Sequence, residues 1–281
     1  MRGSCVAIEK EGSVTNADRS AVQRAFDAYV AAFDMSDTCI AMKYDHTMRV
    51  AKLCEKTASA KGMSAADVDT AWLCGLLHDI GRFEQLRIWR TFKDAASCSH
   101  ARLGLAVLDG DSTFNGKALA GADGRMKLFC VDGDIVAIVR SAVALHSDLS
   151  LPDDLDARTR CFCEIVRDAD KVDIVRVFGE SDVHDVLGLT PGEFANGEIS
   201  DAAMTAVRER RCLSHADRKG SLDGLIGVAC LPFEIVNDSA KGELARLGYL
   251  RELLDRPFGL APTFSSAETR RKYAEVRGAL L

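Results

Sequence analysis

The chain has 281 residues, of which 47% are hydrophobic, and its 36 Lys and Arg against 42 Asp and Glu give a formal net charge of −6. A nonspecific nucleic-acid binder normally carries a basic excess, and no stretch approaches the roughly 20 apolar residues that span a membrane. The sequence therefore predicts a globular protein that has neither nucleic acid nor a membrane as its partner, with enough length for a full hydrophobic core.

We expect residues 1–15 to be a frayed tail without the apolar segment of a signal peptide. The ten cysteines contain no CxxC pair and lie mostly within apolar helical patterns. This pattern is typical of small buried side chains in a reducing compartment. The expected location is therefore the cytoplasm.

The first part of the chain consists of segments with helical apolar spacing. Ser64 and Asp67 form a variant of the capping box, and Gly62 and Gly81 mark helix ends. The predicted helices cover approximately residues 16–33, 36–61, 64–79, 97–108, 132–146 and 154–178. Residues 82–96 are predicted to form a loop over the mouth of a site, and residues 109–132 a glycine-rich loop with a short hairpin.

From Glu180 onward the pattern is again helical, without a Gly/Ser linker before it. The predicted helices cover approximately residues 182–188, 200–212, 217–230, 239–255 and 266–279, and a turn is expected at residues 188–192. We expect a helical domain over residues 16–180 and a C-terminal helical annex over residues 181–281 that packs on it. Because the apolar stripes of the annex are too extensive to face water, they also indicate a subunit contact in a homodimer.

Four of the six histidines lie on the buried faces of four different predicted helices: His46, His78, His100 and His146. Asp79 follows His78 directly, and Asp170 lies beside the apolar stripe of the 154–178 helix. An isolated His-Asp pair is most simply a hydrogen-bonded helix end. Several buried histidines and carboxylates together are costly unless they are paired or bind a metal, and a helical bundle can project such ligands inward. The pattern therefore predicts a site for zinc, iron, manganese, cobalt or nickel.

The order His … His-Asp … Asp, together with the sequence Leu-Leu-His-Asp-Ile-Gly-Arg over residues 76–82, resembles the HD superfamily of metal-dependent hydrolases over about residues 40–178. The resemblance implies an all-α HD-domain bundle in which His46, His78, Asp79 and Asp170 form a first metal site. It also implies that Asp79 bridges to a second metal ion. His100 and His146 match the two additional histidines of the dinuclear members, so the expected cofactors are two divalent ions.

Two aspartates compete for the place of the family's last ligand. In the motif Arg167 to Asp173 the family ligand is the aspartate that follows alanine, which selects Asp170 over Asp168. The helical spacing agrees, because it sets Asp168 between the buried stripes. Ser147 departs from the His-His pair of the HD-GYP branch, and no Gly-Tyr-Pro sequence occurs, so that branch is not favoured.

The implied reaction is hydrolysis of a phosphomonoester or phosphodiester, with a nucleotide as the expected small phosphorylated substrate. Arg82 resembles the family's cation after the HD pair, which meets a substrate phosphate; Lys171 also lies within reach. Their simpler interpretations are a solvated loop arginine and a lysine whose stem packs on apolar surface. Asp79, Arg82 and Lys171 are the expected catalytic residues. The alternatives are a mixed-valence diiron oxygenase with the same ligand set, and a regulatory HD domain whose metal is structural.

Overall fold

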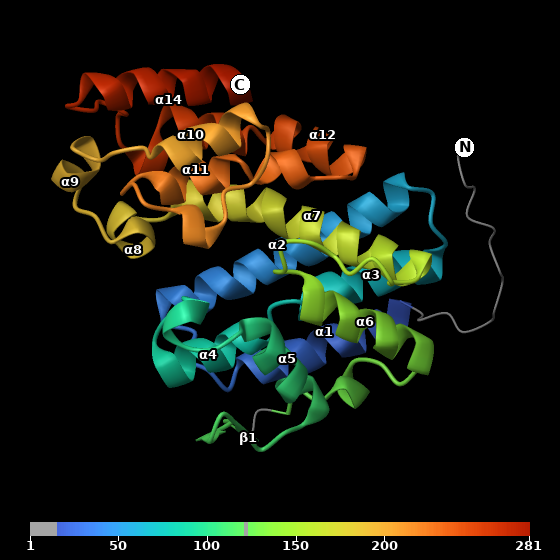
Figure 1. The fold of residues 1–281 in the computed structure, drawn as a ribbon. Coiled ribbons are helices and arrows are strands. Elements are labelled where there is room, and N and C mark those ends of the chain that lie inside the picture. The colour runs from blue at the N-terminus through green and yellow to red at the C-terminus, as the bar shows by residue number, and fades with distance from the viewer. Residues whose placement is uncertain (1–15, 121–122) are drawn as a thin grey trace. The chain divides into compact units, whose positions relative to one another are not determined.

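The computed structural model describes residues 16–120 and 123–281 (Figure 1), and the frayed tail expected for residues 1–15 lies outside them. The predicted all-α class is confirmed, because the described chain consists of helices and one short antiparallel hairpin. The chain divides between Ala169 and Asp170 into two compact units, and each is described by itself. In the described ranges, no helix combines the length and the apolar character that crossing a membrane requires.

The first unit contains the helices that carry the predicted histidines. Its elements are α1 (Asn16–Val30), α2 (Thr38–Ala60), α3 (Ala65–Leu77), α4 (Gly81–Trp89), the 3₁₀ turn η1 (Asp94–Ala96), α5 (His100–Asp109), β1 (Thr113–Phe114), β2 (Lys117–Ala118), η2 (Met126–Leu128) and α6 (Gly133–Leu145). The next helix, α7 (Ala157–Glu180), begins in this unit and continues into the second. The caps Ser64, Ser99 and Asp132 start α3, α5 and α6, because each side chain accepts a hydrogen bond from a backbone N–H of the first turn. These helix starts and the hairpin agree with the sequence prediction.

Two glycines allow the helices around the histidines to approach closely. A Cβ added to Gly75 would lie 2.7 Å from Cα of Ala51, so α3 packs against α2 almost backbone to backbone. A Cβ added to Gly81 would lie 2.4 Å from the carbonyl oxygen of His100, so the start of α4 meets α5 in the same way. Since no larger residue fits at these positions, both glycines set the distances between the helices that carry the histidines.

An aromatic cluster supports the segment that follows the His-Asp pair. The rings of Phe26, Tyr29 and Phe33 contact Phe83 with centroid separations of 5.8–6.0 Å. The hydroxyl of Tyr29 donates a hydrogen bond to the carbonyl oxygen of Ile80 at 3.0 Å. This contact connects α1 with the turn directly after Asp79, and the buried hydroxyl thereby has a partner.

The loop predicted for residues 82–96 is wrong over its first half, where α4 forms instead. Phe83 and Leu86 are buried on one side of α4, and the polar Glu84 and Gln85 are buried as well. Glu84 accepts hydrogen bonds from the backbone N–H of Ala120 and from Arg87. Because these polar side chains are satisfied internally, the helix can be buried although its composition indicates an exposed loop.

The second unit consists of short helices, which are α8 (Val183–Leu187), α9 (Pro191–Ala195), α10 (Asp201–Arg208), η3 (His215–Asp217), α11 (Asp223–Ala229), η4 (Leu231–Glu234), α12 (Asp238–Leu247), α13 (Tyr249–Asp255), η5 (Pro257–Gly259) and α14 (Ala267–Leu280). The turn predicted at residues 188–192 is wrong in part, since α9 begins there with a capping box between Thr190 and Glu193. The single helix predicted over residues 239–255 is two helices, because Gly248 at φ +72° ends α12.

The helix predicted from residue 217 begins later, at Asp223. The buried carboxylate of Asp223 accepts hydrogen bonds from the backbone N–H groups of Ser200, Lys219 and Gly220. These contacts hold the preceding segment in a loop conformation, so that α11 starts only at Asp223.

Candidate metal centre

Three of the four histidines lie at helix ends rather than along helix faces. His46 is on α2, while His78 and His146 are the C-terminal cap residues of α3 and α6 and His100 is the first residue of α5. All four are buried, with exposed fractions of at most 5%, and the neighbouring Asp79 is 3% exposed. The structure therefore brings together five of the residues selected from the sequence.

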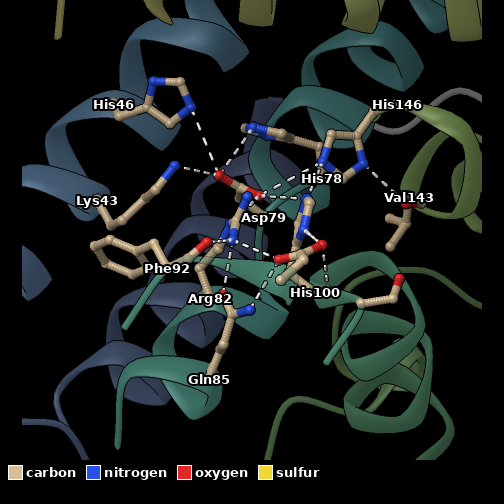
Figure 2. Close-up of polar contacts among 12 residues, drawn as sticks. Lys43, His46, His78, Asp79, Arg82, Gln85, Phe92, His100, Val143 and His146 are labelled. Atoms are coloured by element: carbon tan, nitrogen blue, oxygen red, sulfur yellow. Dashed lines mark hydrogen bonds and ion pairs between the residues drawn. The ribbon is translucent and has the colours of Figure 1, made fainter. Parts of the chain in front are cut away.

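The carboxylate of Asp79 lies at the middle of this group (Figure 2). Its Oδ2 is 3.6 Å from Nε2 of both His46 and His78. Its Oδ1 is 3.6 Å from Nε2 of His100 and 3.5 Å from Nε2 of His146. Each carboxylate oxygen thus faces two imidazole nitrogens, which is the arrangement needed for a carboxylate that bridges two cations. We refer to these groups as the His46/His78 half-site and the His100/His146 half-site.

Hydrogen bonds donated by Nδ1, the ring nitrogen opposite Nε2, orient three of the imidazoles. Nδ1 of His78 lies 2.7 Å from the carbonyl oxygen of Gly75, and Nδ1 of His146 lies 2.9 Å from that of Val143. Nδ1 of His100 lies 2.7 Å from Oδ2 of Asp94. Because these oxygens can only accept, each Nδ1 carries the hydrogen and leaves a lone pair on Nε2 when the ring is neutral. Partners of this kind normally fix metal-binding histidines.

The arrangement of these nitrogen and oxygen lone pairs suits bound cations better than it suits the protein without them. Nε2 of His100 and Nε2 of His146 are 2.9 Å apart, so two lone pairs point at each other. Oδ1 of Asp79 is buried and has no hydrogen-bond partner among the described residues. Unsatisfied buried acceptors are costly, and a divalent metal ion would satisfy all three atoms.

Electrostatics keep two of the candidate ligands, Asp79 and His100, in the protonation states that bind a metal ion. Burial disfavours the charged form of Asp79, but the neighbouring Lys43 and Arg82, together with the imidazoles of His78 and His146, outweigh burial, and the pKa of Asp79 lies well below its ordinary value. Burial lowers the pKa of His100 to about 4 against the opposing hydrogen bond to Asp94, so this ring is neutral near pH 7.

Two further residues join the centre that the sequence did not single out. Nζ of Lys43 lies 2.6 Å from Oδ2 of Asp79. Asp94, in η1, accepts from His100 through Oδ2 and from Arg82 through Oδ1, at 3.0 Å. Lys43 precedes His46 by three residues on α2, and this spacing could have revealed it. Asp94 lies outside any periodic segment, so no local signal marks it.

Arg82 lies beside the carboxylate of Asp79, with Nε 3.5 Å from Oδ1. Its Nη1 donates to Gln85, to the carbonyl oxygen of Phe92 and to Asp94. The guanidinium is thus held in place at the centre, and the interpretation of Arg82 as a solvated loop residue is wrong. Its contact with a substrate phosphate stays a prediction.

The second unit begins with Asp170 and Lys171, so their expected roles at the metal centre stay predictions. Lys171 is buried, and its Nζ lies 3.4 Å from Oε2 of Glu234. The helical-face argument against Asp168 is wrong, because Asp168 is 1% exposed whereas Asp170 is partly exposed. The choice of Asp170 therefore rests on the family motif alone.

The cysteines lie outside this centre. The nine cysteines in the described residues are free, and five of them are buried: Cys54, Cys74, Cys98, Cys163 and Cys230. Cys39 is exposed, so the expectation that the cysteines are small buried side chains does not hold at this position. No thiolate takes part in the two clusters of potential ligands found among the described residues.

Residues 44–174 match the family model described as the HD domain. This range begins on α2 just before His46, ends within α7, and contains every predicted ligand. No curated protein and no solved structure matches the chain.

Proposed function

We propose that this protein is a metal-dependent phosphohydrolase with a dinuclear centre, because residues 44–174 match the family model of the HD domain. The observation that supports this most directly is the symmetry around Asp79, whose two oxygens each face two histidine Nε2 atoms. One metal ion needs only one of these groups. Two groups that share a carboxylate suit two ions.

The ligands follow from this arrangement. His46, His78 and Oδ2 of Asp79 would hold one ion, and His100, His146 and Oδ1 the other. Asp170 would complete the first set, as the resemblance of its motif implies. Divalent ions bound here would activate water and polarise a phosphoryl group.

The residues of the chain would supply charge and orientation. Nη1 of Arg82 is anchored on Asp94, Gln85 and Phe92, so the guanidinium is prepared to meet the oxygens of a phosphate without reordering. A preorganised cation of this kind stabilises the charge that develops during phosphoryl transfer. Lys171 is proposed as a second cation toward the substrate, and a nucleotide is proposed as the substrate by family resemblance.

The test is a panel of nucleotides, sugar phosphates and bis(p-nitrophenyl) phosphate, offered to protein reconstituted without oxygen with manganese, cobalt, nickel or iron. We expect release of phosphate or of a nucleoside product, or of p-nitrophenol from bis(p-nitrophenyl) phosphate. This release should be lost in His78→Ala and retained in the matched control His184→Ala, whose histidine is exposed outside the centre.

Two other outcomes would replace the proposal. Turnover that requires oxygen, together with a mixed-valence diiron signal in electron paramagnetic resonance, would show an oxygenase. Metal-loaded protein that neither hydrolyses the panel nor consumes oxygen would support a regulatory HD domain.

A further inference from the structure

Lys43 makes the shortest ion pair at the metal centre. Its Nζ lies 2.6 Å from Oδ2 of Asp79, and its side chain is only 13% exposed. Figure 2 shows the ammonium group beside His46 and directed at the carboxylate. The lysine stem reaches this position because Lys43 lies one turn before His46 on α2.

The ammonium group and a metal ion in the His46/His78 half-site would require the same atom. Oδ2 is the oxygen that faces Nε2 of His46 and of His78. Two cations in contact with one carboxylate oxygen repel each other, and the repulsion is strong where burial excludes water. An ion can therefore bind fully at Oδ2 only when Lys43 moves away from it.

The His100/His146 half-site does not have this conflict. Arg82 lies beside Oδ1, with Nε at 3.5 Å, and Arg82 also has the carboxylate of Asp94 at 3.0 Å. Lys43 has Asp79 as its one carboxylate partner within the described residues. An ion at Oδ1 would leave Arg82 paired with Asp94, whereas an ion at Oδ2 would deprive Lys43 of its ion pair.

A resting place for the released ammonium group is present next to it. Nζ of Lys43 lies 5.6 Å from the ring centre of Phe92, within the range of a cation–π contact. Phe92 is partly exposed, so a small rotation of the lysine side chain would exchange the carboxylate for the ring and water.

We propose that Lys43 is an internal competitor of the metal: it lowers the metal affinity of the His46/His78 half-site selectively and leaves Oδ2 when that half-site fills. The two half-sites then load in a graded manner although both offer two histidines and one carboxylate oxygen. This inference rests on the proposed metal centre but not on the hydrolytic reaction.

The experiment measures Co²⁺ binding by the visible absorption of the bound ion, so that no turnover is needed. Each half-site is isolated in the full chain by removing the histidines of the other. His100→Ala with His146→Ala leaves the His46/His78 half-site, and His46→Ala with His78→Ala leaves the His100/His146 half-site. Lys43→Met is then added to both backgrounds. Lys43→Arg keeps the charge, and Lys272→Met is a matched control, because Lys272 is also a buried lysine in ion pairs.

We expect Lys43→Met to tighten Co²⁺ binding by about tenfold or more where only the His46/His78 half-site remains, because the competing ion pair is gone. The other background should tighten by a clearly smaller factor, because Nζ of Lys43 is in direct contact with Oδ2 and not with Oδ1. Lys43→Arg and Lys272→Met should leave both affinities near their starting values. An unchanged or weaker affinity of the His46/His78 half-site in Lys43→Met would overturn the proposal.

A second measurement covers the case in which a combined variant does not fold. Lys43→Gln alone, in the otherwise unaltered chain, should show a larger rise in melting temperature on addition of Co²⁺ than the wild type. An equal or smaller rise would also overturn the proposal. Absence of Co²⁺ binding in the wild type and in both backgrounds would instead contradict the metal centre itself, so the two failures are distinguishable.

Discussion

Asp94→Asn should weaken one half of the metal centre and leave the other intact. Asp94 accepts from Nδ1 of His100 at 2.7 Å through Oδ2, and from Arg82 and Gln85 at 3.0 and 2.9 Å through Oδ1. Asparagine has one acceptor oxygen and one amide that can only donate. Whichever way its side chain turns, the amide faces a donor, either the imidazole N–H or the guanidinium and amide groups.

The expected cost is that of losing a carboxylate behind a metal-binding histidine, about tenfold to a hundredfold in metal affinity, or roughly 1.4–2.7 kcal/mol. Because His100 is buried and little water surrounds it, the negative charge of Asp94 interacts more strongly with the imidazole than it would in solvent. Asp94 also keeps this charge: burial raises its pKa, but the hydrogen bonds from His100 and Gln85 and the charge of Arg82 together outweigh burial and hold the pKa below the ordinary value.

Co²⁺ titration of the two isolated half-sites measures this effect. Asp94→Asn should weaken binding when His100 and His146 are the remaining histidines, and should have little effect when His46 and His78 remain. Asp109→Asn is the control, because Asp109 forms an exposed ion pair with Arg140 that contributes little. An equal loss in both half-sites, or no loss in either, would refute the role of Asp94 in orienting His100.

Three further substitutions test other parts of the account. Gly81→Ala should destabilise the fold by about 1–3 kcal/mol in urea unfolding, because its Cβ would overlap backbone atoms of α5, whereas Gly133→Ala, with open space around its Cβ, should be nearly neutral. Arg82→Ala should lower kcat/KM on phosphorylated substrates by about tenfold to a hundredfold at unchanged metal content, and full activity would remove its substrate role. Arg167→Met should weaken metal binding at His146, because Arg167 donates to the backbone carbonyls on both sides of that residue; unchanged affinity would contradict this positioning.

Sequence patterns could predict the helical class, the main helix starts and five residues of the centre. The helix starts could be predicted because Ser64, Ser99 and Asp132 each cap the first turn of the helix that directly follows them in the sequence. The histidines could be predicted as site residues, because several buried histidines are costly unless they share a ligand such as a metal ion. Their approach to a single carboxylate was implied by resemblance to a family and not by spacing.

The elements that were missed depend on tertiary contacts or on weak local signals. The helix α4 contains Glu84 and Gln85, which are polar in sequence but are buried and hydrogen-bonded in the fold. The capping box of Thr190 and Glu193 was present in the sequence, but the neighbouring Pro191 and Gly192 favoured a turn. Gly188 and Gly248 both follow helix ends and have positive φ, but the sequence pattern predicts a turn only at Gly188.

The residues that complete the centre were missed for a different reason. Asp94 lies in a short 3₁₀ turn whose position depends on Arg82, Gln85 and His100 together, and such a convergence has no period in sequence. The domain boundary near residue 180 and the roles of Asp170 and Lys171 stay predictions.

In the proposed metal centre, Asp79 bridges two metal ions. Elemental analysis of reconstituted protein tests it most directly, with the wild type compared with the double variant His100→Ala, His146→Ala and with Asp79→Ala. We predict about two ions per chain in the wild type, about one in the double variant and a loss of both in Asp79→Ala. One ion per chain in the wild type that is unchanged in the double variant, or full metal retention in Asp79→Ala, would contradict the claim.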